Sequence, residues 1–269
     1  MRGRGLNFEE LRSYVSGDDI RVIDWRVTAR MQKPFVRVYT EERDRSTLLV
    51  VDQRMNMFFG SRVSMKSVIA AEAAALVAWR VFQQGDRVGA FIFNDKSTEQ
   101  IRPRRSRATV LRVLEMLVRL NRLLHATYES QSAELQLNHI LQKVAQLAHR
   151  DHLIVVVSDF DGADAMTRDL LRSLAEHNDV VALFTYDPLA VHLPPVGQLV
   201  VSDGELQVEL PFGDEKVRKT ILEASDRRMR HIFSWQREIR VPVMPLSTAE
   251  DTALQIRHLL GQVAARRTR

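Results

Sequence analysis

Cysteine is absent from this chain of 269 residues, which excludes a disulfide framework, a zinc finger and a catalytic thiol. Long apolar runs are also missing. The longest apolar segment, residues 68–79, is broken by Glu72 and is shorter than the roughly 18–20 residues of a membrane helix. The opening MRGRGLNFEE lacks the apolar core of a signal peptide. We therefore expect a cytoplasmic protein that meets membranes only indirectly.

Nucleotide-binding and hydrolytic motifs do not occur either. The sequence contains no G-x-x-x-x-G-K-[ST] loop, no G-x-G-x-x-G after a strand, no H-E-x-x-H and no G-x-S-x-G. The eight His residues are scattered, and His149 and His152 lack a third ligand nearby. These absences argue against an enzyme.

Lysine is scarce among the cationic residues. Arg accounts for 33 of the 39 Lys and Arg residues, which face 34 Asp and Glu and leave a formal net charge of +5. Arginine forms planar, bidentate pairs with carboxylates inside proteins and at interfaces. The basic run Arg102–Arg107 contains no aromatic residue, so it predicts a solvated loop or a protein-docking surface rather than a nucleic-acid site.

Strand and helix patterns alternate along residues 46–269. Apolar or β-branched runs predict strands at 46–52, 87–93, 98–102, 153–157, 180–186 and 241–246, and helical spacing predicts helices at 64–84, 107–124, 134–149, 165–177, 214–240 and 249–266. Ser247 or Thr248 is the expected cap of the last helix. The alternation predicts an α/β domain with a doubly wound, mainly parallel sheet and helices on both faces. A hairpin insertion near residues 196–211 interrupts it, with Asp203-Gly204 as its turn.

Residues 1–45 form a charged N-terminal extension with short strands, expected at 20–25 and 35–39. The extension carries 10 Lys and Arg with 8 Asp and Glu. We predict that it packs on the main domain through a buried or half-buried ion-pair network. The members of this predicted network are Arg12, Asp18, Asp19, Arg21, Asp24, Arg30, Glu41 and Glu42.

Two of the predicted strands have an acid at their carboxyl end, Asp52 and Asp159. In an open parallel sheet, ligands bind at the carboxyl ends of the strands. Converging carboxylates suit a hard cation such as Mg²⁺, whereas a single acid after a strand more often caps a helix or pairs with an Arg. Two acids beside a metal could also support hydrolysis, but no general base or phosphate-binding loop accompanies them.

A long motif at the start of the chain resembles the opening signature of the bacterial family called domain of unknown function 58. The motif spans Gly3–Arg30, and the match continues at Glu41-Glu42-Arg43, Phe59-Gly60, Lys66, Gly85–Gly89 and Ser158-Asp159-Phe160. The resemblance implies a von Willebrand factor A-like fold and no established enzymatic activity. Genes of the family commonly lie beside those of MoxR-type AAA+ ATPases. The resemblance therefore implies such an ATPase as a partner, in the maturation or remodelling of an unknown client complex.

The chain departs from the von Willebrand A pattern at the cation site. Those domains bind a divalent cation through D-x-S-x-S after the first strand, a Thr on a second loop and an Asp on a third. Here the first motif reads Asp52-Gln53-Arg54-Met55-Asn56, no Gly-Thr loop is recognisable, and Asp159 matches the third-loop Asp. The guanidinium of Arg54 would repel a divalent cation at this site. Two like unit charges ~4 Å apart repel by ~4 kcal/mol at an effective dielectric of ~20, and the double charge of the cation doubles this energy.

The residues therefore predict a degenerate metal-ion-dependent adhesion motif. We expect Arg54 to replace the metal and pair with Asp52 and Asp159, while Asn56 adds a neutral amide, so that no cofactor is needed. These four residues form the expected docking edge of a non-enzymatic adaptor. The alternative is a binding module that is independent of an ATPase, in which Arg54 points away and Asp52, Asn56 and Asp159 hold Mg²⁺.

Overall fold

The computed structural model describes residues 5–15, 17–19, 23–42, 45–125, 136–193, 198–202, 207–211 and 214–267. Contacts within the chain divide it into two units, Met1–Asp44 and Arg45–Arg269. Each unit is described by itself below.

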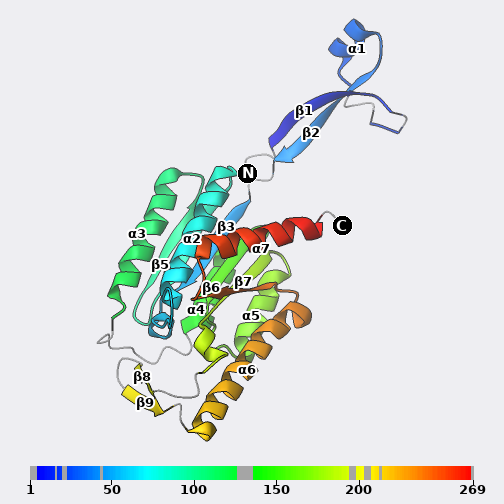
Figure 1. Cartoon of the computed structure of the whole chain (residues 1–269). Coiled ribbons are helices and arrows are strands. Elements are labelled where there is room, and N and C mark those ends of the chain that lie inside the picture. Colours follow the sequence, from blue (N-terminus) through cyan, green and yellow to red (C-terminus); the bar gives the residue numbers. More distant parts are fainter. Residues whose placement is uncertain are drawn as a thin grey trace. The chain divides into compact units, whose positions relative to one another are not determined.

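Six strands form the central sheet of the larger unit (Figure 1). They are β3 (Ser46–Asp52), β4 (Arg87–Phe93), β5 (Thr98–Arg104), β6 (His152–Ser158), β7 (Asp179–Tyr186) and β10 (Val243–Ser247). Their order across the sheet is β10-β7-β6-β3-β4-β5, and every neighbouring pair is parallel except β4 and β5. The first strand of this sheet, β3, lies in its middle, and β4 and β5 follow on one side of it. The chain then crosses to the other side of β3, where β6, β7 and β10 follow in turn. The winding direction therefore reverses between β3 and β6, where open sheets of this kind bind ligands.

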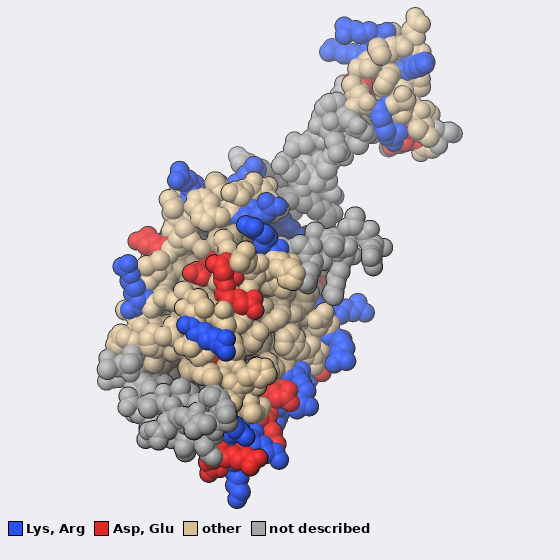
Figure 2. Space-filling model, viewed as in Figure 1, with Lys and Arg blue, Asp and Glu red and all other residues tan. Residues whose placement is uncertain are grey.

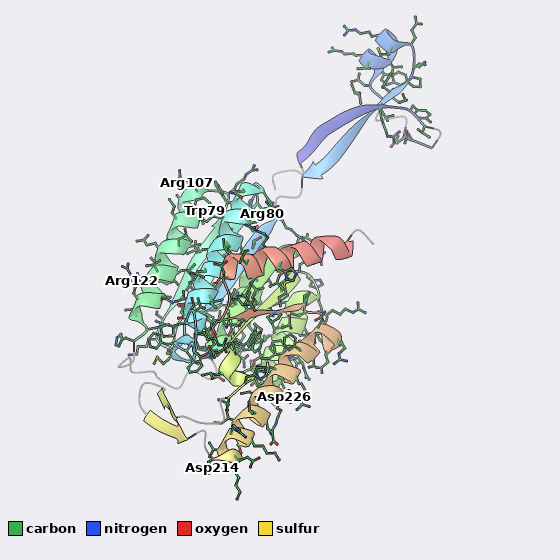
Figure 3. All side chains as sticks on the ribbon, viewed as in Figure 1. Trp79, Arg80, Arg107, Arg122, Asp214 and Asp226 are labelled. Carbon is green, nitrogen blue, oxygen red and sulfur yellow. The ribbon has the colours of Figure 1, made fainter. Side chains whose placement is uncertain are left out.

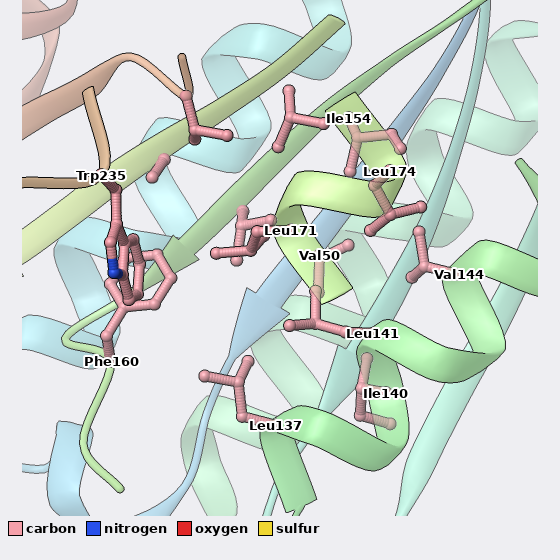
Figure 4. Packing of buried hydrophobic residues seen from close by; sticks show 14 of the residues in the cluster. Val50, Leu137, Ile140, Leu141, Val144, Ile154, Phe160, Leu171, Leu174 and Trp235 are labelled. Atoms are coloured by element: carbon pink, nitrogen blue, oxygen red, sulfur yellow. The ribbon is translucent and has the colours of Figure 1, made fainter. Parts of the chain in front are cut away.

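Helices cover both faces of this sheet (Figure 1). One face carries α2 (Lys66–Gln83), α3 (Arg107–Leu123) and α7 (Thr252–Arg267), and the other carries α4 (Gln136–Leu147), α5 (Ala165–Ala175) and α6 (Glu215–Glu238). Successive strand residues face opposite sides, so β3 contributes Leu48 and Val50 to one core and Leu49 and Val51 to the other. Figure 4 shows part of the first core, where α4 and α5 pack over Val50 and Ile154. The predicted doubly wound fold is confirmed.

Two local predictions for this unit concern the hairpin and the start of α7. The strands β8 (Gln198–Ser202) and β9 (Gln207–Pro211) pair antiparallel, as the alternating runs predict, while the expected Asp203-Gly204 turn lies outside the described residues. The predicted cap of α7 is wrong. Asp251 provides it instead, because its Oδ1 accepts the backbone N–H of Leu254 at 2.8 Å. Among the described residues, none of the helices combines the length and apolarity that crossing a membrane requires.

The smaller unit is built on one antiparallel pair, β1 (Gly5–Ser13) and β2 (Phe35–Glu42), with the short helix α1 (Trp25–Met31) between them. The predicted strand at 20–25 is wrong at its end, since Trp25 begins α1. The cause is Asp24, whose Oδ1 accepts the backbone N–H of Arg26 at 3.0 Å and of Val27 at 3.2 Å and so caps the helix. Residues 20–22 lie outside the description, and β1 was not predicted. Packing of residues 1–45 on the main domain stays a prediction.

Candidate functional site

The sheet brings the four predicted edge residues together at the reversal between β3 and β6. Asp52 is the last residue of β3, and Asp159 directly follows β6, the neighbouring strand. Asn56 lies in η2 (Met55–Met57), the single helical turn that follows β3. Asp52, Arg54 and Asp159 are each no more than 3% exposed. This is therefore a buried cluster of charges at the carboxyl edge.

Arg54 binds Asp52 through its guanidinium fork. Its Nε lies 3.0 and 3.1 Å from the two carboxylate oxygens, and its Nη2 lies 2.7 Å from Oδ2. The backbone N–H of Arg54 donates to Asp52 Oδ1 at 3.0 Å, and Ser158 Oγ donates to Oδ2 at 2.6 Å. The guanidinium also lies 5.8 Å from the ring centre of Phe93. The charge of Asp52 is thus compensated by a residue two positions away.

Asp159 takes its contacts from three other segments. Lys66 Nζ, at the start of α2, donates to Oδ2 at 2.5 Å, and Asn56 Nδ2 donates to Oδ1 at 2.7 Å. Arg228, on α6, has Nη2 3.4 Å from Oδ1 and 2.6 Å from the Asp159 carbonyl oxygen. Its Nη1 also pairs with Asp161 Oδ1 at 2.8 Å. Asp159 therefore forms ion pairs with Lys66 and Arg228, whereas the sequence prediction gave it Arg54 as its partner.

Arg228 and the roles of Ser158 and Lys66 in this cluster were not predicted from the sequence. Ser158 and Lys66 appeared only as part of the family resemblance. Arg228 is one of seven Lys and Arg residues in α6, and no local pattern distinguishes it from the others. Its place in the site depends on how α6 packs on the end of β6. Phe160 contacts Trp235 of α6 there, with ring centres 5.2 Å apart.

The surroundings of these groups fix their charge states. Burial lowers the pKa of the Arg54 guanidinium, but the charge of Asp52 outweighs this and holds the pKa above its ordinary value. Burial raises the pKa of Asp159, but Lys66, Arg228 and Arg54 together hold it below its ordinary value. On the next loop, Asp95 Oδ2 accepts the backbone N–H of Met55 at 2.8 Å, and burial raises the pKa of this carboxyl. Arg54 and Asp159 are both ionised near neutral pH.

Comparison with known families places the chain. Residues 10–231 match the family described as "Protein of unknown function DUF58". The chain belongs to this family. It is 31% identical to the uncharacterized protein Rv1480 of Mycobacterium tuberculosis (strain ATCC 25618 / H37Rv) over 255 residues, which cover 93% of this chain and 77% of that protein. The uncharacterized protein Mb1516 of Mycobacterium bovis gives the same values.

This DUF58 chain is also similar to solved structures of low sequence identity. The conserved hypothetical protein BatB from Bacteroides thetaiotaomicron has a TM-score of 0.48 at 9% identity, over 84% of this chain and 100% of that one. The SpRpn10 VWA domain has a TM-score of 0.41 at 11% identity, over 79% of this chain and 93% of that domain.

The residues that the structure describes at this edge of the DUF58 chain do not fit a divalent cation. Such an ion needs several oxygen ligands that face one open position. Here the fork of Arg54 holds the Asp52 oxygens, and Lys66 and Asn56 hold those of Asp159. A cation would have to displace Lys66 and lie beside a guanidinium. In the part of the chain that the structure describes, no group of three or more His, Asp or Glu could hold a metal ion.

The predicted ion-pair network of the N-terminal unit is described only in part. Arg12 and Asp18 form a bidentate pair, with both N–O distances 2.7 Å and side chains 42% and 20% exposed. The hydrogen bond from Arg12 is the main reason why the pKa of Asp18 falls to about 2. Asp24 caps α1, and Arg30 lies in its last turn. Nothing further is assigned to Asp19, while Arg21 and the side chains of Glu41 and Glu42 lie outside the description.

The basic run lies away from this edge. Because β5 is antiparallel to β4, Arg104 lies opposite Val88, at the amino end of the parallel strands. Arg107 begins α3, and Figure 3 shows it at the opposite end of that helix from Arg122. On the face drawn in Figure 2, Lys and Arg are spread around the unit with Asp and Glu among them, rather than gathered in one patch. This distribution gives no support to a nucleic-acid surface.

Proposed function

We propose that this DUF58 member is a non-enzymatic protein-binding adaptor that docks a partner at the carboxyl edge of its sheet without a divalent cation. The observation that carries the proposal is the internal neutralisation of Asp52 and Asp159. Arg54 and Lys66 contact the two carboxylates directly, and Arg228 adds a third cation at the rim. Among the residues that the structure describes, the edge presents neither a nucleophile beside a base nor an open cation site, so binding is the role that its chemistry supports.

The partner that we propose is a MoxR-type AAA+ ATPase, acting on a client complex of unknown identity. The support for this partner is the sequence resemblance, together with the lack of a nucleotide-binding loop in this chain. In such a pairing the ATPase supplies the chemical energy and the adaptor supplies recognition. We propose that the pair acts in the cytoplasm.

The rim of the edge offers a matched pair of variants. Arg228 contacts both Asp159 and Asp161, and its side chain is 36% exposed. Arg230 lies on the same helix, is 73% exposed and pairs with Asp226. Arg228→Glu reverses a charge at the docking edge, whereas Arg230→Glu makes the same change beside it. We expect Arg228→Glu to weaken partner binding and Arg230→Glu to leave it unchanged.

The experiment is capture of the ATPase by the tagged full chain from its native cytoplasm, in nucleotide-free buffer with and without EDTA. We expect an AAA+ ATPase that is identified by mass spectrometry and is retained in EDTA. Failure to retain any ATPase would reject the partner. Equal retention by wild type and Arg228→Glu would reject the edge. Retention that needs Mg²⁺ and is lost in Asp159→Ala would favour the alternative, a Mg²⁺-dependent von Willebrand A-type module.

A further inference from the structure

A short loop at the same edge, residues 58–65, carries an exposed apolar side chain. Val63 is 68% exposed, a value that only Trp25 matches among the large apolar side chains whose exposure is described. Arg62 beside it is also exposed and has no ion pair with a residue that the structure describes. The loop joins η2 to α2, so it connects Asn56 to Lys66, two of the residues that bind Asp159.

A buried carboxylate fixes this loop. Asp187, which follows β7, is only 2% exposed. Its Oδ2 accepts the backbone N–H of Ser61 at 2.7 Å, and its Oδ1 accepts the Ser61 hydroxyl at 2.6 Å. Leu189 N–H donates to Oδ1 at 2.9 Å, and the Thr248 hydroxyl donates to Oδ2 at 2.5 Å. Burial raises the pKa of Asp187, but these hydrogen bonds outweigh it and hold the pKa below its ordinary value.

The two ends of the loop are also tied down. Ser64 N–H donates to the Thr248 carbonyl oxygen at 3.2 Å, and Lys66 N–H donates to that of Phe59 at 2.8 Å. The chain approaches itself so closely at Gly60 that a Cβ there would lie 2.1 Å from the carbonyl oxygen of Ser64. Glycine is therefore required for the loop to close. Residues 61–63 are held from both sides, by the ends of β7 and β10.

This arrangement is unusual for a surface loop. Connecting loops are commonly mobile, and burying an ionised carboxylate costs free energy unless hydrogen bonds compensate for it. Here four donors compensate a buried Asp, and two of the four belong to Ser61. A loop that is ordered before binding loses less conformational entropy when a partner docks. The fold therefore holds Arg62 and Val63 in a fixed position beside the docking edge.

We propose that Arg62 and Val63 form a preorganised contact tip, which inserts into an apolar pocket with an acidic rim on the partner. Val63 is the apolar anchor, Arg62 pairs with the rim, and Asp187 is a positioning residue that acts through Ser61. The inference rests on the proposed function and names the AAA+ ATPase as the protein that carries the pocket. An exposed cation with no described partner is complementary to such an acidic rim.

The test measures affinity between the purified full chain and the purified MoxR-type ATPase by biolayer interferometry. We expect Val63→Glu and Arg62→Glu each to weaken binding about tenfold or more, as loss of an interface anchor does. The matched control is Leu254→Glu, which places the same charge on α7 at a side chain that is 62% exposed. All three positions are exposed, so the variants keep the fold, and circular dichroism checks this.

The outcomes separate the two proposals. Wild-type affinity in Val63→Glu overturns the contact tip and leaves the proposed function standing, whereas no binding by wild type overturns both. An equal loss in Leu254→Glu also overturns the tip. The positioning role has its own readout, because an Asn side chain cannot accept all four donors. Asp187→Asn should speed hydrogen exchange at the backbone amides of Ser61 and Ser64, and unchanged exchange there rejects the role of Asp187.

Discussion

Two Asp–Arg pairs in this protein share their contact geometry and differ in their surroundings. Arg54 and Asp52 approach to 2.7 Å with side chains 4% and 0% exposed, while Arg12 and Asp18 also approach to 2.7 Å with side chains 42% and 20% exposed. In the exposed pair, water can replace either partner. In the buried pair, loss of one partner leaves an uncompensated charge in a medium of low dielectric. The same two residue types therefore have different consequences for the fold.

The two ion pairs also differ in the groups that surround them. The buried pair is one of two adjacent pairs at the reversal of the sheet, and Ser158 adds a donor to Asp52. The exposed pair adds one backbone donor, from Val15 to Asp18 at 2.9 Å, and so organises a turn. We infer that the first pair defines the docking edge and that the second shapes a local loop. Substitutions at each pair should therefore differ in how much they destabilise the fold.

Arg54→Met should cause the largest loss. It removes the guanidinium while Asp52 stays buried, and breaking a buried pair in this way costs about 3–5 kcal/mol of unfolding free energy. Urea denaturation followed by circular dichroism measures the loss. A change below about 1 kcal/mol would mean that water or another residue reaches Asp52 without cost, and the buried-pair account would then be wrong.

Asp159→Asn should cost about 2–3 kcal/mol at pH 7, because it removes charge-assisted hydrogen bonds from Lys66 and Asn56. The folded-state pKa of Asp159 lies below its unfolded value of about 3.9, so its contribution is complete above that pH and is lost as the pH falls through the folded pKa. The difference in unfolding free energy between wild type and variant should shrink as the pH falls below about 4. A difference that does not change with pH would contradict the ionised, paired state of Asp159.

Double-mutant cycles compare the two pairs directly. In the buried pair, the loss in Asp52→Asn/Arg54→Met should be smaller than the sum of the single losses by about 1–3 kcal/mol, since the second change removes the stranded charge. The matched cycle, Asp18→Asn/Arg12→Met, should show weaker coupling, below about 1 kcal/mol, because this pair is exposed to water. Equal coupling in both cycles would mean that burial does not distinguish the pairs.

Arg12→Met should have the smallest effect. An exposed ion pair contributes little and is screened by salt. We expect a loss of unfolding free energy below about 1 kcal/mol at low ionic strength, and a smaller loss in 1 M NaCl. A loss comparable with that of Arg54→Met would show that the N-terminal pair supports more of the fold than its exposure suggests.

The sequence predicts the sheet because its strands are encoded locally. Four apolar runs, β3, β4, β6 and β7, are buried on both faces, and the α/β class follows from the alternation of strands with helices. Local signals fail where one polar side chain decides the backbone. Asp24 starts a helix at Trp25, where the apolar pattern indicated a strand, and Asp251 starts α7 three residues after Thr248, the later of the two expected caps.

The residues of the candidate site also differ in whether local sequence predicts them. Asp52 and Asp159 could be predicted, because Asp52 ends one strand, Asp159 follows another, and parallel strands end at one edge. Arg54 could be predicted as the partner of Asp52, which is two residues away. Arg228 could not, because it reaches Asp159 across 69 positions of the chain when α6 packs on Phe160 through Trp235. Asp187 was missed for the same reason, since its donors come from Ser61 and Thr248.

The docking edge that we propose uses its own cations in place of a divalent ion. The most direct measurement is isothermal titration calorimetry of the purified chain with Mg²⁺ and with Mn²⁺, in parallel with Asp159→Ala. We expect no saturable binding of either ion to the wild type up to millimolar concentrations. Micromolar binding to the wild type that disappears in Asp159→Ala would contradict the account, because it would place a metal ion where Arg54 and Lys66 now balance the charge.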